Sequence, residues 1–177
     1  MEAHRIDAHA LGTAIGQLVT SLAEHYGSAE NLVIIGIANG GIPLGERLAA
    51  GLGKTLGREI PTGSANITFH RDDIRSNPIP GVKERTDLPF PVDGATIILA
   101  DDVIHTGRTV RAALNEIFDL GRPERVVLAV LCDRGHRSLP VQPDFTGLKL
   151  ETAATQKVKV SLDSQNPAND TLAVIDG

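Results

Sequence analysis

The stretch IILADDVIHTGRT, residues 97–109, decides how this chain folds and where it binds a ligand. Four apolar residues run into two adjacent aspartates, Asp101 and Asp102, and a Thr-Gly turn follows. A continuous apolar run is typical of a strand that is buried on both faces of a parallel sheet. In such sheets, ligands bind beyond the carboxyl ends of the strands, at a topological switch point. We therefore expect the acid pair at the end of a strand over residues 95–100, facing a ligand.

The residues that follow the apolar run indicate what this ligand is. Two neighbouring carboxylates repel each other, and two vicinal hydroxyls that donate to them, helped by a divalent cation, would offset this repulsion. The next residues open a helix, whose free N–H groups and dipole form an anion cradle together with Thr106, Gly107, Arg108 and Thr109. A diol site beside a phosphate site describes a ribose 5-phosphate. The alternative is a plain helix N-cap at Asp102 or Thr106, which accounts for one polar residue and not for the whole group.

The rest of the chain alternates between strand and helix patterns. Helices are predicted over residues 7–27, 42–57 and 108–121, and strands over 31–37, 64–70, 95–100, 125–132, 145–151, 157–162 and 171–177. The alternation predicts an α/β fold with a parallel sheet and right-handed crossovers. Residues 71–94 are rich in charge, Pro and Gly, and are predicted to form a functional loop.

Composition limits the remaining possibilities. A length of 177 residues predicts one domain spanning residues 1–177. An aromatic content of 3% and a net charge of −5 disfavour base stacking and a globally basic nucleic-acid surface. Cys132 lies in an apolar run, which predicts a buried, reduced thiol. No signal peptide and no membrane span is recognisable, so a cytoplasmic protein is expected.

Several motifs resemble known sites without matching them. GLGKT, residues 51–55, lacks the first glycine of a phosphate-binding P-loop and closes a helix where that loop would open one. GIANGG is not a dinucleotide-binding GxGxxG. The six histidines lack the spacing of a zinc site. RDD, residues 71–73, is equally compatible with a solvated loop.

The opening stretch matches the phosphoribosyl-pyrophosphate (PRPP) signature of the type I phosphoribosyltransferases. Four apolar residues, two acids, two apolar residues and one variable residue precede Thr-Gly-x-Thr. The chain further resembles the PyrR family of pyrimidine-operon regulators and uracil phosphoribosyltransferases, from roughly residue 10 to the end. The segments that carry this resemblance are NITFHRDD, TDLPFPVDG, DDVIHTGRTVRAAL and DLGRPERVVLAVLCDRGHRSLPVQPDFTG.

The resemblance implies a type I phosphoribosyltransferase fold, in which helices flank a central, mostly parallel sheet and the chain-terminal segments form a small hood. It implies transfer of ribose 5-phosphate from PRPP to uracil, giving UMP and pyrophosphate, with Mg²⁺. The resemblance implies catalytic roles for Asp101, Asp102 and Arg71, the last in a loop over residues 71–85 that closes over the substrate. Asp101 and Asp102 would bind the ribose hydroxyls and, through substrate or water, Mg²⁺. The other implied substrate-binding residues are Thr106, Gly107, Arg108 and Thr109 for the 5-phosphate; Ala38, Asn39, Gly40 and Gly41 for pyrophosphate; Asp133 and Arg137 for the base; and Val103 and His105. The family often has a strained cis peptide in the pyrophosphate loop, which glycines would ease.

The sequence also departs from the family. The pyrophosphate loop, ANGG, lacks the usual basic and hydroxyl residues, and the aromatic residue common before Thr-Gly is His105. No Lys or Arg lies between Arg5 and Arg47, and Gln142 replaces an arginine, so weak or no RNA binding is expected. Three functions stay open: a uracil phosphoribosyltransferase, an RNA-binding regulator that responds to UMP, and a phosphoribosyltransferase for another base. The family forms dimers and larger assemblies, so a homo-oligomer is expected.

Overall fold

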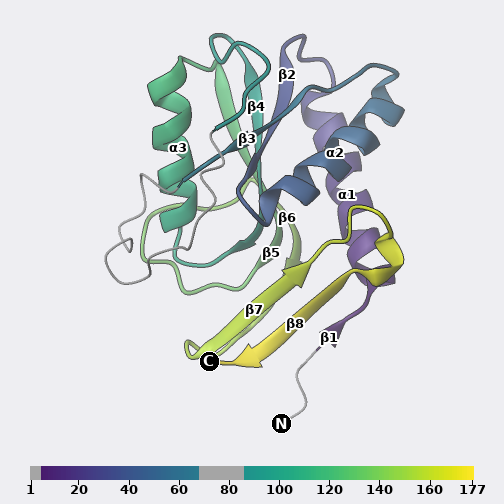
Figure 1. The fold of residues 1–177 in the computed structure, drawn as a ribbon, viewed down its shortest axis with the longest axis vertical. Helices are drawn as coiled ribbons and strands as arrows, with labels where there is room; N and C mark the ends of the chain where they lie inside the picture. Colours follow the sequence, from purple (N-terminus) through teal and green to yellow (C-terminus); the bar gives the residue numbers. More distant parts are fainter. Residues whose placement is uncertain (1–4, 68–85) are drawn as a thin grey trace.

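The computed structural model describes residues 5–67 and 86–177, and its centre is a five-stranded sheet (Figure 1). The strand order is β3-β2-β4-β5-β6, and every neighbouring pair is parallel. The strands are β2 (Leu32–Ile37), β3 (Thr62–Ala65), β4 (Thr96–Ile104), β5 (Arg125–Asp133) and β6 (Phe145–Lys149). The expected α/β fold with a parallel sheet is confirmed.

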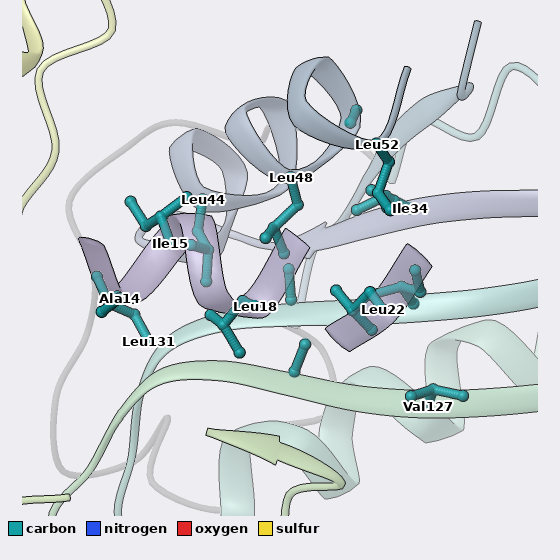
Figure 2. Close-up of a cluster of buried hydrophobic side chains, with 14 of the residues drawn as sticks. Ala14, Ile15, Leu18, Leu22, Ile34, Leu44, Leu48, Leu52, Val127 and Leu131 are labelled. Carbon is teal, nitrogen blue, oxygen red and sulfur yellow. The ribbon is translucent and has the colours of Figure 1, made fainter. Parts of the chain in front are cut away.

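Helices cover both faces of this sheet. In Figure 1, α1 (Ala8–Tyr26) and α2 (Gly41–Leu56) lie on one side and α3 (Arg108–Leu120) on the other. Two clusters of buried apolar side chains result, one between the sheet and α1 and α2, the other between the sheet and α3. Figure 2 shows the first cluster, where α1 presents Leu18 and Leu22 and α2 presents Leu48 towards the sheet. All six residues of β2 are buried, as a strand covered on both faces requires.

Both ends of the chain build a second, smaller sheet. Its strands are β1 (Arg5–Ile6), β7 (Gln156–Ser161) and β8 (Thr171–Asp176), in the order β1-β8-β7, and both pairs are antiparallel. A short 3₁₀ helix, η2 (Pro167–Asn169), precedes β8. Figure 1 shows this sheet beside the helical layer of α1 and α2. It is the small hood from chain-terminal segments that the resemblance implies.

The chain order reverses between β2 and β4. From β2 the chain passes through α2 to β3 on one side, whereas β4 pairs with the opposite side of β2. This arrangement is the topological switch point at which open parallel sheets bind ligands. The loop after β2 and the loop after β4 therefore meet at one place.

Several strand boundaries differ from the sequence prediction, and the differences are largest for β3 and β4. β4 continues to Ile104, past the expected end at residue 100, because β5 extends beside it and Ile104 is paired with Asp133. β3 begins two residues earlier than predicted and ends at Ala65, and predicted residues 68–70 lie outside the described part of the chain.

The remaining expectations concern features away from the site. The P-loop-like residues 51–55 lie inside α2, where no phosphate loop can form. Cys132 is buried as predicted, and burial raises the pKa of its thiol to about 12. No helix in the described residues is both long enough and apolar enough to cross a bilayer.

Candidate functional site

The acid pair lies near the end of β4, beyond the last residue that pairs with β2. Ala100 is the last β4 residue in register with β2, whereas Asp101 is still paired with Val130 of β5. The aspartates therefore stand inside a strand that is supported on one side only. On the other side, the loop that follows β2 occupies the space next to them.

Burial and mutual repulsion govern the ionisation of this pair. Asp101 is only 5% exposed, and burial, followed by the neighbouring Asp102 carboxylate, raises its pKa well above the usual value. Burial also raises the pKa of Asp102. One Asp101 oxygen accepts from the Asp102 N–H at 3.0 Å, and one Asp102 oxygen accepts from the Val103 N–H at 2.9 Å. Backbone N–H groups thus orient both carboxylates.

The Ala38–Gly41 loop lies directly against the acid pair. A Cβ atom on Gly40 would stand 2.2 Å from Oδ2 of Asp102, and one on Gly41 would stand 2.2 Å from the Ala100 carbonyl oxygen. The Ala38–Asn39 peptide is cis, the conformation that the family resemblance implies. Gly40 itself has φ −65° and ψ −30°, which any residue adopts. The absence of a side chain at Gly40 and Gly41 lets the loop approach β4 closely.

The Thr-Gly turn leads from β4 into α3 and presents backbone donors. Gly107 is the N-cap of α3, and its φ of 90° lies in the left-handed region that favours glycine. The Arg108 N–H donates to Oγ1 of Thr106 at 3.3 Å. Within residues 5–67 and 86–177, the N–H groups of Thr106 and Gly107 donate to no protein acceptor. They are available to an anion at the start of α3.

The end of β5 and the loop after it, residues 133–142, contact the turn before α3, and we call this segment the β5 loop. Asp133 and Arg137 form an ion pair in it, with Nη2 of Arg137 2.7 Å from Oδ2 of Asp133. Burial alone would raise the pKa of the Asp133 carboxyl, but hydrogen bonds from Arg137 and from the Gly135 N–H outweigh it and lower that pKa. The two residues that the resemblance assigns to the base, Asp133 and Arg137, are thus in direct contact.

Arg134 is a site candidate that the sequence reading did not single out. Its side chain is 5% exposed, and its guanidinium donates to Oγ1 of Thr152 and to the Ala153 carbonyl, both at 3.3 Å. These partners are neutral, and within the described residues no carboxylate pairs with Arg134. A buried cation with neutral partners only is costly. DRGHR shows that a further arginine stands near Arg137, but the sequence alone does not show that the side chain of Arg134 is buried.

His105 stands between the acid pair and the Thr-Gly turn. Burial, followed by the nearby charges of Arg134, His136 and Arg137, lowers the pKa of its imidazole. The ring packs edge-on against that of His136, with centroids 6.1 Å apart. These surroundings favour the neutral form of the His105 imidazole.

Two predicted features remain. Arg71 and the closing loop over residues 71–85 lie outside the described residues. Among the residues that the structure describes, no group of three or more His, Cys, Asp or Glu side chains could hold a metal ion by itself.

Comparison with known proteins identifies the family. The family model for the phosphoribosyl transferase domain matches residues 4–165. The Bifunctional protein PyrR of Picosynechococcus sp. is 45% identical over 157 residues, covering 89% of this chain and 88% of that protein. The Bifunctional protein PyrR of Deinococcus deserti is 48% identical over 149 residues, covering 84% and 81%.

Solved structures agree on the fold. The hypoxanthine phosphoribosyltransferase of Trypanosoma cruzi superposes with a TM-score of 0.70 at 16% identity, covering 97% of this chain and 95% of that chain. The corresponding enzyme of Staphylococcus aureus gives a TM-score of 0.65 at 13% identity, covering 86% and 79%. At such identities the likeness shows the fold alone. With the family model and the relatives taken together, the chain belongs to the PyrR family and is built on a phosphoribosyl transferase domain.

Proposed function

We propose that this protein is a Mg²⁺-dependent uracil phosphoribosyltransferase that converts PRPP and uracil to UMP and pyrophosphate. One observation carries the proposal: the acid pair of β4, with Asp101 buried and Asp102 half-buried, stands against the Ala38–Gly41 loop at the sheet's switch point. Proteins named Bifunctional protein PyrR, at 45% and 48% identity, support the same reading.

The acid pair would bind the ribose. Burial raises the pKa of both carboxyls, and for Asp101 the neighbouring Asp102 carboxylate adds to the rise. Two vicinal hydroxyls that each donate to one carboxylate offset this cost, which makes the site selective for a diol. Asp101 and Asp102 would orient the sugar so that its C1 faces the base.

Two helix starts would bind the phosphates. α2 begins after Gly40 and α3 after Gly107, and neither glycine has a side chain to cap the free N–H groups. By contrast, α1, away from the site, is capped by Asp7, whose carboxylate accepts from the Ala10 N–H at 2.9 Å. Uncapped helix starts are anion sites. We assign the Ala38–Gly41 loop to pyrophosphate and residues 105–109, with Val103 before them, to the sugar phosphate.

The reaction then needs positioning more than covalent chemistry. The bond from C1 to the pyrophosphate oxygen breaks, a bond from C1 to N1 of uracil forms, and the N1 proton passes to the departing pyrophosphate. Positive charge that develops at C1 would be stabilised by the ionised acid pair, and the fixed backbone donors would hold both phosphate groups. The two carboxylates are hard oxygen donors that suit Mg²⁺ through the ribose or water, and the bound ion would neutralise the leaving pyrophosphate.

The base would lie against the β5 loop. Arg134 supplies a buried cation with neutral partners, suited to a carbonyl oxygen of uracil. Asp133 stays our candidate for a base contact, and His105 offers a neutral ring beside the same loop. The donors of Arg137 all point to other parts of the chain, so we assign it to holding this loop.

Arg71 stays a predicted catalytic cation of the loop over residues 71–85. We further expect one domain, a homo-oligomer and a cytoplasmic setting, where PRPP is made. ANGG carries no cation, so ionised side chains contribute little to pyrophosphate binding in this loop.

A panel of bases tests the proposed function. The protein is mixed with PRPP, Mg²⁺ and, one at a time, uracil, cytosine, orotate, hypoxanthine and guanine, and nucleotide and pyrophosphate are measured together. We expect UMP and pyrophosphate in equal amounts with uracil only. A purine nucleotide as the main product would make the protein a phosphoribosyltransferase for another base, and no product from folded protein would reject the enzyme.

A further inference from the structure

The β5 loop and the turn before α3 are fastened together by backbone hydrogen bonds. The Thr106 carbonyl accepts from the N–H groups of Ser138 and Leu139 at 3.0 and 3.1 Å. A Cβ atom on Gly107 would come 3.3 Å from Cβ of Val141, so the two segments also pack closely. The segment that would contact the base and the segment that would hold the 5-phosphate therefore move as one unit.

Arg137 stands at the centre of this unit. Its Nε donates to the Val141 carbonyl at 2.9 Å, and its Nη1 donates to the His105 carbonyl at 2.9 Å. Its Nη2 donates to Oδ2 of Asp133 at 2.7 Å. Longer bonds of 3.4 Å to the Gly135 carbonyl and to Oε1 of Gln142 engage the remaining donors. The side chain is 13% exposed, and each of the five N–H groups of the guanidinium has an acceptor in the chain.

Holding a carbonyl also fixes the neighbouring N–H. A trans peptide is planar, and its C=O and N–H point in opposite directions. Arg137 holds the His105 carbonyl towards the β5 loop. The Thr106 N–H belongs to the same peptide and therefore points away from the β5 loop. The bonds of Ser138 and Leu139 to the Thr106 carbonyl do the same for the Gly107 N–H. Within the described residues, neither of these two N–H groups donates to a protein acceptor.

We propose that Arg137 is a positioning residue for the 5-phosphate: through the His105 carbonyl it aims the Thr106 N–H at that group, and it holds the β5 loop whose Ser138 and Leu139 aim the Gly107 N–H, without touching the phosphate itself. This inference rests on the proposed function for its ligand, PRPP. An arginine with free donors on the surface would bind phosphate directly, whereas the donors of Arg137 are hydrogen-bonded to acceptors within the chain. Lysine cannot replace this arginine, because a single ammonium group cannot reach the three carbonyls and the carboxylate that the planar guanidinium contacts.

The test separates the two phosphate sites by ligand. Calorimetry measures the affinity of wild type, Arg137→Ala and Arg137→Lys for PRPP with Mg²⁺, for ribose 5-phosphate and for pyrophosphate. Arg125→Ala, at the exposed start of β5, is the matched control. We expect Arg137→Ala to bind ribose 5-phosphate and PRPP at least tenfold more weakly, with less than a twofold change for pyrophosphate. Arg137→Lys should fall between wild type and Arg137→Ala, and Arg125→Ala should match wild type.

Chemical rescue gives a second readout. Guanidinium at low millimolar concentration should restore part of the ribose 5-phosphate affinity of Arg137→Ala, and methylammonium should not. Equal losses for ribose 5-phosphate and pyrophosphate, or no loss for either, would overturn the inference. If Arg137→Ala does not fold, Arg137→Lys decides, and wild-type affinity in it would overturn the inference. Wild type that fails to bind PRPP would instead count against the proposed function.

Discussion

Arg47 of α2 holds Asp170 of the hood with both ends of its guanidinium. Nη1 bonds to Oδ2, and Nη2 bonds to Oδ1 at 2.9 Å and to the Asp163 carbonyl at 2.6 Å. Asp170 is 2% exposed, so this ion pair is shielded from water on the carboxylate side. Because α2 begins at the Ala38–Gly41 loop, the pair ties the hood to a helix of the site.

Asp170→Asn should lower the free energy of unfolding by about 2–3 kcal/mol, because it leaves Arg47 half-buried without its counter-charge. Urea denaturation measures the effect. Glu151→Gln, an exposed carboxylate beside the hood, is the control and should be within about 0.5 kcal/mol of wild type. Equal stability of both variants would show that the ion pair does not hold the hood.

Asp101→Asn and Asp102→Asn should each reduce kcat/KM for PRPP by roughly 100-fold or more, because each removes a charge that binds the ribose and stabilises C1. Initial rates with varied PRPP measure this loss. Glu124→Gln, an exposed carboxylate before β5, should keep wild-type rates. Full activity in either aspartate variant would contradict the assignment of the diol site.

The raised pKa of Asp101 also predicts how stability depends on pH. The folded protein holds this proton more tightly than the unfolded chain, so its contribution to stability is complete below the unfolded value of 3.8 and is lost as pH rises through the folded pKa. Asp101→Asn removes this loss and should be the more stable protein at pH 7, by on the order of 1 kcal/mol. Thermal melting of both proteins between pH 3.5 and about 8 measures the gap, which should close towards acid pH. A gap that is constant over the whole range would refute this account.

Gly40→Ala should reduce kcat/KM by on the order of 100-fold, because its Cβ would come 2.2 Å from Oδ2 of Asp102 and push the carboxylate aside. Steady-state kinetics and melting are measured together. Gly16→Ala is the matched control, since a Cβ there meets nothing within 4 Å in the exposed face of α1. It should stabilise the protein by up to about 1 kcal/mol without changing the rate. Normal kinetics in Gly40→Ala would show that Asp102 tolerates displacement.

RNA binding should be weak. The segment between Arg5 and Arg47, which includes α1, carries no Lys or Arg, and the donors of Arg137 are engaged within the chain. We expect a dissociation constant no tighter than about 1 μM for a pyrimidine-leader hairpin at physiological salt, as for non-specific binding. Gel shift with and without UMP measures it. Nanomolar binding would show that this surface recognises RNA by other means.

The parallel sheet, its flanking helices and the place of the site could be predicted from sequence, because apolar runs and helical periodicity are local signals. The end of β4 could not, since only the neighbouring strand β5 keeps residues 101–104 extended. The chemistry of Asp101, Asp102 and the Thr-Gly turn was readable because it lies within one short stretch. Gly40 and Asp102 lie close together although their segments are far apart in the chain, and no pattern in either segment predicts this proximity.

The roles of the two arginines in the β5 loop depend on burial, which sequence alone does not give. DRGHR shows Arg134 and Arg137 as similar residues. In the fold, Arg134 is buried among neutral partners, whereas Arg137 is paired with Asp133 and holds three carbonyls. Their difference comes from Thr152 and from the His105 carbonyl, which tertiary structure brings to the loop.

The most direct test of the central claim is a calorimetric titration of PRPP with Mg²⁺ into wild type and the double variant Asp101→Asn/Asp102→Asn. We predict one binding site per chain in wild type and an affinity at least about 100-fold lower in the folded double variant. PRPP binding of equal strength to both proteins would contradict the claim that the acid pair of β4 binds the ribose.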